Sequence, residues 1–229
     1  MHKGSKITFG PASSAKGLFD EYVSDPNKPV PCSASIAQGM PRQYMIEDQR
    51  FAWQRSDVLS YETSKLASDT TLAGPVKVTL YVSTTGTDAD FVVKLIDVYP
   101  NDHANDSPRN VTGQGGQGFT VPMGGYQMMV RGEPMRAKYR NSWSKPSPLT
   151  PNKVEKVEFA MPDVCYTFKS GHKVMVQVQS SWFPLVDRNP QTFCDIYKAK
   201  ASDFKKATMR VYLSGPTASR LTVGAIPNP

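Results

Sequence analysis

The sequence predicts an all-β fold, a two-sheet jelly-roll sandwich with a proline-rich N-terminal arm. Three observations indicate this fold. Apolar and polar residues alternate in several short segments, glycine and proline separate these segments, and neither a βαβ alternation nor an internal repeat is visible. About eight strands with long connecting loops are typical of two sheets packed face to face. With 229 residues, of which 39% are hydrophobic, the chain is long enough to bury such a core.

The individual strands follow from the same patterns. The clearest is Val76–Val82, where every second residue is aliphatic. Asp90–Tyr99 is apolar on both faces and is expected at the centre of a sheet. A short helix is expected around Ala199–Lys206. The remaining expected strands are Asp57–Thr63, Tyr126–Glu133, Val154–Met161, Lys173–Ser180, Thr208–Leu213 and Arg220–Ile226.

The first 45 residues are expected to form an extended arm or linker, and residues 46–229 the sandwich. The arm is rich in proline, glycine and serine and has no hydrophobic period. Its scattered apolar residues indicate that it docks on another surface.

Charge and composition exclude several classes of protein. The net charge is +7, but the basic residues are dispersed and no basic stripe is interleaved with aromatic residues, so nucleic-acid binding is not predicted. No apolar run reaches the roughly 18 residues of a membrane span, and no membrane partner is expected. The first residues lack the apolar centre of a secretory signal. The compartment stays open between a bacterial periplasmic or secreted parent enzyme and a cytoplasmic one.

No motif in the chain carries catalytic chemistry. A serine hydrolase of the α/β type needs a Gly-x-Ser-x-Gly elbow, which is missing, so no catalytic residue is predicted. Gly113–Gly118 matches the spacing of a dinucleotide fingerprint, but Pro122 prevents the helix that must follow. His103 and His172 are expected in turns, and neither a metal nor a cofactor is expected. Asp88 and Asp90 are a remote candidate for holding a cation.

The three cysteines, Cys32, Cys165 and Cys194, do not form a disulfide framework, because their number is odd and no Cys-x-x-Cys occurs. Cys165 and Cys194 could pair, or all three could be packed thiols. We favour the thiols.

The segment Gln179–Phe193 reads as a rigid structural corner. Pro184 removes a backbone donor and ends the preceding strand, while Trp182 and Phe183 can each bury a large apolar area. Asp187 and Arg188 are expected to pair. Asn189 is expected to bond the local backbone.

Four stretches taken together resemble the C-terminal domain of the X-Pro dipeptidyl-peptidase family of serine hydrolases. These stretches are Glu47–Thr63, Gly86–Pro100, Gly125–Trp143 and Phe168–Phe193. The family includes the cocaine esterases, the α-amino-acid ester hydrolases and the glutaryl-7-aminocephalosporanic acid acylases. The resemblance covers about Asp25 to the C-terminus and is strongest to the ester hydrolase and acylase branch.

The resemblance implies a galactose-binding-like jelly roll without catalytic residues. In the family this domain packs against an α/β-hydrolase domain that carries the catalytic triad, and it walls the substrate cleft. The segment Ile36–Met45 would lie near that cleft. The resemblance and the aromatic corner together give the expected interdomain or cleft contacts, which are Gln38, Met40, Tyr44, Trp182 and Phe183. The chain alone is expected to be inactive, and a homo-oligomer stays open.

A second hypothesis is a free-standing β-sandwich that binds carbohydrate. Jelly rolls often hold sugars on aromatic faces, and an exposed Trp53, Trp143 or Trp182 would serve this purpose. A third, weaker hypothesis is nucleic-acid binding through the net charge.

Overall fold

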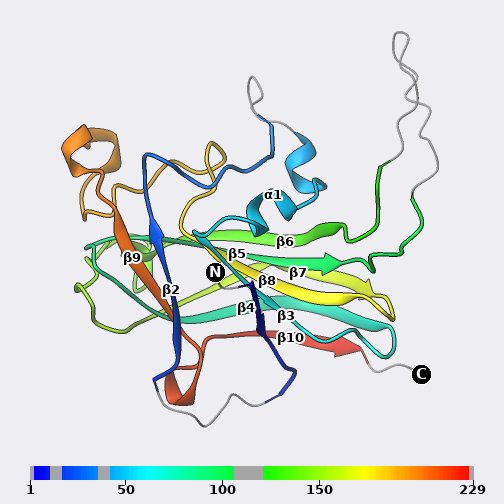
Figure 1. Cartoon of the computed structure of the whole chain (residues 1–229). Helices are drawn as coiled ribbons and strands as arrows, with labels where there is room; N and C mark the ends of the chain where they lie inside the picture. Colours follow the sequence, from blue (N-terminus) through cyan, green and yellow to red (C-terminus); the bar gives the residue numbers. More distant parts are fainter. Residues whose placement is uncertain (1–2, 11–16, 36–41, 106–120, 227–229) are drawn as a thin grey trace, which may run out of the picture.

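Two β-sheets pack face to face in the computed structural model, which describes residues 3–10, 17–35, 42–105 and 121–226 (Figure 1). The first sheet has the strand order β1-β3-β8-β5-β6. In the second sheet β4 lies between β7 on one side and β10 and β9 on the other, and β2 pairs with β9. Among these pairings only β1 with β3 is parallel. The strands are β1 Lys3–Lys6, β2 Phe19–Ser24, β3 Val58–Glu62, β4 Thr70–Thr84, β5 Asp90–Val98, β6 Gln127–Arg136, β7 Glu155–Phe168, β8 Lys173–Gln179, β9 Ala207–Tyr212 and β10 Arg220–Ile226.

The helical elements are short. The α-helix α1 spans Arg50–Trp53. In the described residues, no helix has the length and apolar character needed to cross a membrane. The 3-10 turns are Arg42–Met45, Ala137–Tyr139, Ile196–Lys198, Ala201–Asp203 and Gly215–Thr217.

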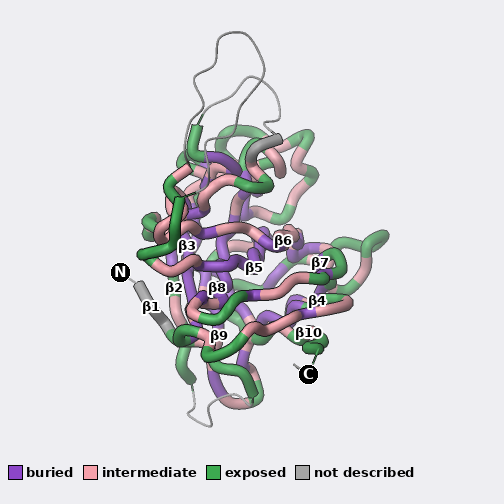
Figure 2. Tube along the Cα trace, turned by 90° about the vertical axis from the view of Figure 1, so that its right-hand side faces the viewer, coloured by how far each residue is buried: buried purple, intermediate pink, exposed green. Residues whose placement is uncertain are grey.

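The main core lies between the two sheets, and alternate residues of each strand supply it. Phe91, Val93 and Leu95 of β5 face inward and share this core with Val78 and Leu80 of β4. Burying each such side chain stabilises the fold by roughly 1.5–3 kcal/mol. Figure 2 shows the buried positions running through the middle of the sandwich, along β5 and β8.

The outer face of the first sheet is also covered. The opposite side of β5 presents Val92, Lys94 and Ile96, all fully buried. Residues 30–32, α1 and the corner after β8 supply the covering side chains, which form three small clusters. A second, thinner layer therefore lies over this sheet, and β5 is buried on both faces as its sequence predicts.

All eight predicted strands are present, but two other expectations are wrong. The segment Ala199–Lys206 is not a helix of useful length, because only Ala201–Asp203 forms a 3-10 turn. The N-terminal segment is not only an extended arm, since β1 joins the first sheet and β2 the second. The domain division at residue 45 stays a prediction.

Candidate functional site

The corner after β8 is fastened to the N-terminal segment by main-chain hydrogen bonds. The Cys32 amide donates to the Phe183 carbonyl (2.8 Å), and the Phe183 amide donates to the Val30 carbonyl (3.0 Å). The Val30 amide donates in turn to the Ser181 hydroxyl (2.7 Å). Pro184 cannot extend this ladder, so the pairing is confined to one isolated bridge between Pro31 and Phe183. Two segments about 150 positions apart in the chain thus form one unit.

Trp182 closes this unit over the first sheet. Its indole is only 4% exposed and lies against Gly132 of β6, where a β-carbon would come within 2.9 Å of the ring. Tyr44 meets the indole edge to face, with ring centroids 5.8 Å apart. This arrangement requires glycine at position 132.

Lys94 lies beneath the same layer and is completely buried. Its ammonium donates to Gln49 Oε1 (2.8 Å) and lies 5.2 Å from the Trp182 ring and 5.8 Å from the Phe51 ring. Burial lowers the pKa of Lys94 to about 7, although Cys32 and Glu47 oppose this shift. The layer therefore contains a base that titrates near neutral pH.

Gln177 and Gln179 of β8 extend this polar strip. Gln177 pairs with Lys94 across the sheet, and both glutamine side chains are fully buried. Within the described residues, the Oε1 atoms of both glutamines and Nε1 of Trp182 have no hydrogen-bond partner. Each unpaired buried polar atom costs about 1–3 kcal/mol. These three unpaired atoms reduce the stability that the outer layer gains from burial.

Phe183 faces away from Trp182 and is 40% exposed. It lines a shallow hollow of about 230 Å³ together with Arg188, Tyr197 and Phe204. The Arg188 guanidinium lies 5.8 Å from the Phe183 ring and 5.2 Å from the Phe204 ring. The adjacent residues Trp182 and Phe183 thus lie on opposite sides of the corner, one buried and the other exposed.

The expected pairing of Asp187 with Arg188 is wrong. Arg188 instead donates to the Pro26 carbonyl (3.0 Å), and the main-chain carbonyl of Asp187 accepts from Arg136 (3.0 Å). The Arg188 guanidinium is positioned by the Phe183 and Phe204 rings and by the Pro26 carbonyl. Two of these three contacts are distant in the chain or lie beyond the corner, so the local sequence does not reveal them.

Asn189 anchors the far end of the corner. Its side-chain oxygen accepts from the Gln191 amide (2.7 Å), as predicted, and its amide group donates to Asp90 (2.7 Å). Asp90 also receives two hydrogen bonds from Arg136, each 2.9 Å long. This buried network holds the corner against the end of β5.

The neighbouring carboxylate, Asp88, is also buried and serves the structure. It accepts from the amides of Ala89 (2.9 Å) and Lys138 (3.1 Å). Burial, followed by the nearby Asp90, raises the pKa of Asp88 to about 6. No group of three or more potential metal ligands occurs in the described part of the chain.

His172 is more than the turn residue that the sequence suggested. It is buried, and its Nδ1 lies 2.9 Å from Asp97 Oδ1, while Tyr166 donates to the other oxygen of that carboxylate (2.7 Å). His103 is exposed, like residues 101–105 around it, and its ring packs edge to face on Tyr99 with ring centroids 4.8 Å apart. Across the residues that the structure describes, no serine hydroxyl is bonded to either histidine.

The predicted contact residues therefore divide into three groups. Tyr44 and Trp182 touch each other inside the outer layer, whereas Phe183 lies on the surface. Gln38 and Met40 fall outside the described residues, as does the glycine motif at 113–118. The three cysteines are free thiols, but only Cys32 is a buried, packed thiol as favoured; Cys165 is exposed and Cys194 is partly exposed.

Sequence reasoning missed Lys94 and Gln49. A lysine in the middle of the apolar run Asp90–Tyr99 was the available signal, because a charge on a strand buried on both faces must find a partner.

Comparison with known proteins identifies the family. Residues 2–222 match the X-Pro dipeptidyl-peptidase C-terminal non-catalytic domain. The chain belongs to this family. Its members are described as non-catalytic, in agreement with the absence of a nucleophile elbow from the sequence.

Three similar proteins are each much longer than this chain. The cocaine esterase of Rhodococcus sp. (strain MB1 Bresler) is 28% identical over 205 residues, which are 90% of this chain and 32% of that protein. A solved α-amino acid ester hydrolase is 41% identical, with a TM-score of 0.85 over 98% of this chain and 35% of that one. An aminopeptidase from a marine sediment archaeon, Thaumarchaeota archaeon, is 39% identical, with a TM-score of 0.82 over 95% and 34%. The chain thus spans about a third of the length of these relatives.

Proposed function

We propose that this chain is the accessory jelly-roll domain of a serine hydrolase that cleaves esters or amides. The parent would be of the α-amino-acid ester hydrolase, acylase or X-Pro dipeptidyl-peptidase type. Family membership, the similarity to an ester hydrolase and an aminopeptidase, and the coverage of a third of each support this proposal. The remaining two thirds of such a parent would include the α/β-hydrolase domain with its catalytic triad.

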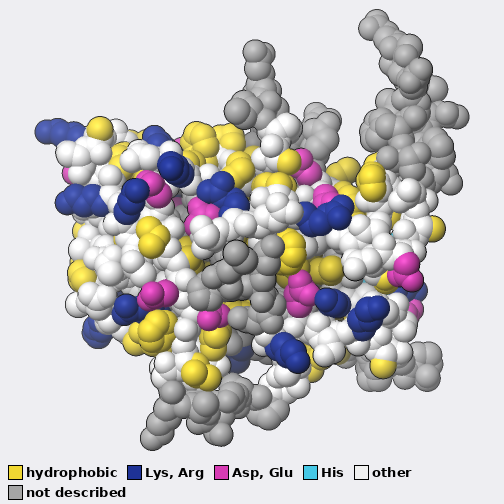
Figure 3. Space-filling model, viewed as in Figure 1, with side chains coloured by type: hydrophobic (Ala, Val, Ile, Leu, Met, Phe, Trp, Pro, Cys, Tyr) yellow, Lys and Arg dark blue, Asp and Glu magenta, His cyan; other side chains and the backbone are white. Residues whose placement is uncertain are grey.

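The contact with that domain is proposed to lie on the corner surface, which we define as Met45, Ile46, Phe183 and Tyr197. These side chains are 40–87% exposed. Their segments, residues 42–46 in blue and the orange region around 197, lie along the upper edge of the molecule in Figure 1. Figure 3 shows hydrophobic side chains interspersed with Lys and Arg in this upper part of the face. Phe183 and Tyr197 line one hollow, whereas Met45 and Ile46 lie farther along this edge in Figure 1, and we propose that the hydrolase domain covers both exposed apolar spots.

The corner surface is also built to resist deformation. Trp182 and the Asp90–Asn189 pair fix the corner from below, and the bridge at Pro31 fixes its edge. A rigid wall positions a substrate better than a mobile loop does, because less freedom is lost on binding. We therefore assign the domain a role in shaping one side of the parent enzyme's cleft.

A binding experiment tests the contact. The chain is titrated with the α/β-hydrolase domain encoded in the same reading frame, and heat of binding and hydrolysis of an amino-acid ester are measured. We expect binding, a rise in ester hydrolysis, and at least tenfold weaker binding for the double variant Ile46→Ser/Phe183→Ser. Ile226→Ser, an exposed aliphatic residue at the end of β10, is the matched control. Equal affinity of the double variant and the control would contradict the assigned surface.

The chain alone should not hydrolyse p-nitrophenyl esters above background, because the sequence contains no nucleophile elbow. Turnover that persists after treatment with a covalent serine-hydrolase inhibitor and repeated purification would contradict this expectation.

A further inference from the structure

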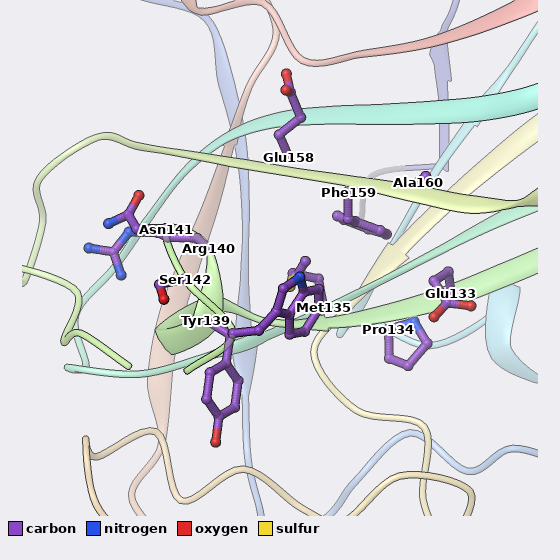
Figure 4. Close-up of a pocket in the computed structure, with 11 residues that line it drawn as sticks. Glu133, Pro134, Met135, Tyr139, Arg140, Asn141, Ser142, Glu158, Phe159 and Ala160 are labelled. Atoms are coloured by element: carbon purple, nitrogen blue, oxygen red, sulfur yellow. The ribbon is translucent and has the colours of Figure 1, made fainter. Parts of the chain in front are cut away.

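A second concave surface lies between the end of β6 and the first part of β7. It has a volume of about 420 Å³. Met135 and Phe159 contribute apolar walls, and Glu133, Tyr139 and Asn141 lie around it, as Figure 4 shows. Trp143 completes the lining. We call it the Trp143 hollow.

Trp143 is the most exposed of the three tryptophans, with 75% of its surface accessible. Its ring is within 24° of parallel to the Tyr139 ring, with centroids 6.1 Å apart. Stacked on Tyr139 at the wall of a hollow, the indole presents a flat apolar face to solvent, and such a face can pack against a ligand.

The loop that carries Trp143 is held without help from the indole. Arg140, whose side chain is almost completely buried, donates to the carbonyls of Ala137 (3.2 Å), Ser147 (3.0 Å) and Pro148 (3.0 Å). The Ser147 amide donates to the Lys138 carbonyl (2.8 Å), which closes the loop. The aromatic platform is therefore in place before any ligand arrives, and ordering it costs little on binding.

Polar groups with free bonding capacity lie beside the platform. Within the described part of the chain, the Glu133 carboxylate makes no hydrogen bond or ion pair, and partial burial raises its pKa. Asn141 makes only a 3.5 Å contact to the Ser147 hydroxyl. Figure 4 shows Glu133 at one end of the hollow and Asn141 at the other, so a strong acceptor and an amide remain available at its two ends.

We propose that the Trp143 hollow binds a neutral saccharide. The apolar C–H face of one sugar ring would stack on the indole, while hydroxyl groups of that ring and of neighbouring sugar units would bond Glu133 and Asn141. The volume falls in the range of about 300–1,000 Å³ that is usual for small-molecule sites. A flat protein surface would bury the Glu133 carboxylate without a partner, which is costly. This argument rests on the hollow itself and does not depend on the contact proposed for the corner surface.

Affinity gel electrophoresis with four soluble polysaccharides tests the site. The probes are xyloglucan, galactomannan, mixed-linkage β-glucan and arabinoxylan, and any that retards the protein is followed by calorimetry with its hexasaccharide. We expect retardation by at least one polysaccharide, at least tenfold weaker binding for Trp143→Ala, and a smaller loss for Trp143→Phe. Tyr197→Ala, which removes an equally exposed aromatic ring from the corner surface, should bind like the unmodified chain.

Three results would overturn the proposal. The first is no retardation by any of the four polysaccharides. The second is an equal loss of binding in Trp143→Ala and Tyr197→Ala, with both variants folded by circular dichroism. The third is a change of sedimentation coefficient in Trp143→Ala without a change in retardation, which would make the hollow a contact between copies of the chain.

Discussion

The two faces of β5 are buried in opposite ways. Its inner face gives Phe91, Val93 and Leu95 to the largely apolar core between the sheets, whereas its outer face places Lys94 between Val92 and Ile96. The core requires only apolar residues of suitable volume. The outer layer depends on single polar contacts, such as Lys94 with Gln49, and on close packing at Gly132. Many apolar residues could therefore replace those of the inner face, whereas the outer face depends on particular residues.

The largest effect is expected in the core. Phe91→Ala should lower the free energy of unfolding by about 3–5 kcal/mol, because the fully buried ring leaves a cavity between two rigid sheets. Urea denaturation followed by circular dichroism measures the change. The control Phe9→Ala, at an exposed position, should stay within about 0.5 kcal/mol of the unmodified chain. A loss below about 1 kcal/mol for Phe91→Ala would show that the sheets can close the gap.

Gly132→Val should disturb the outer layer and leave the core intact. The new side chain would meet the Trp182 ring and the Met129 sulfur, and such overpacking costs about 1–3 kcal/mol. A change of Trp182 fluorescence and faster hydrogen exchange at residues 30–32 would report displacement of the corner. Ala160→Val, at an exposed position of β7, is the control. Unchanged fluorescence in Gly132→Val would mean that the space between Gly132 and the Trp182 ring can hold a larger side chain.

Lys94→Met tests the cost of the buried charge. An unfolded chain binds a proton at Lys94 up to about pH 10.5, whereas the folded chain releases it near pH 7, so stability should rise with pH between these values. Below pH 7 the cost is fully present. The variant should be more stable than the unmodified chain at pH 6, by about 1 kcal/mol, and should lose the rise above pH 7.

Exposed Lys153→Met should keep that pH dependence. Parallel stability curves for Lys94→Met and the unmodified chain from pH 6 to pH 10 would contradict the lowered pKa of Lys94.

Asp88→Asn should give an effect of about the same size as Lys94→Met, with the opposite dependence of stability on pH. The pKa of Asp88 is raised from 3.8 to about 6, so the folded state binds more protons between these values and stability should fall as pH rises from about 4 to 6. Asparagine keeps the oxygen that accepts from Ala89 and Lys138 but removes the charge. We expect a flatter profile and a gain of about 1 kcal/mol at pH 7, measured by thermal unfolding. Asp187→Asn, at an exposed site, should leave the profile unchanged.

The sequence predicts the strands well because the alternation of apolar and polar residues can be recognised within each strand segment by itself. It places the start of β4 six residues late, because Gly74 and Pro75 look like a break. The structure accommodates them in a bulge, where the register with β7 shifts between Gly74 and Val76. Strand β2 was not predicted, because its six residues lie in a segment rich in proline, glycine and serine and are too few to show a clear alternation. It is a strand because it pairs with β9.

The candidate site was predictable only in part. Trp182 and Phe183 are adjacent and chemically similar, yet one is buried and the other exposed, because the bridge to Pro31 decides which side each faces. That bridge joins segments about 150 positions apart, and no local pattern encodes it. The same holds for Trp143, whose exposure depends on how Arg140 holds its loop.

A completely buried lysine, whose pKa burial lowers to about 7, lies beneath the layer in which Tyr44 packs against Trp182. Any partner that settles on this side and brings a charge near Gln49 would change how tightly Lys94 holds its proton. Assembly would then exchange protons with the buffer, and the heat of association would depend on the buffer's ionisation enthalpy. The affinity of this domain for such a partner would then depend on pH.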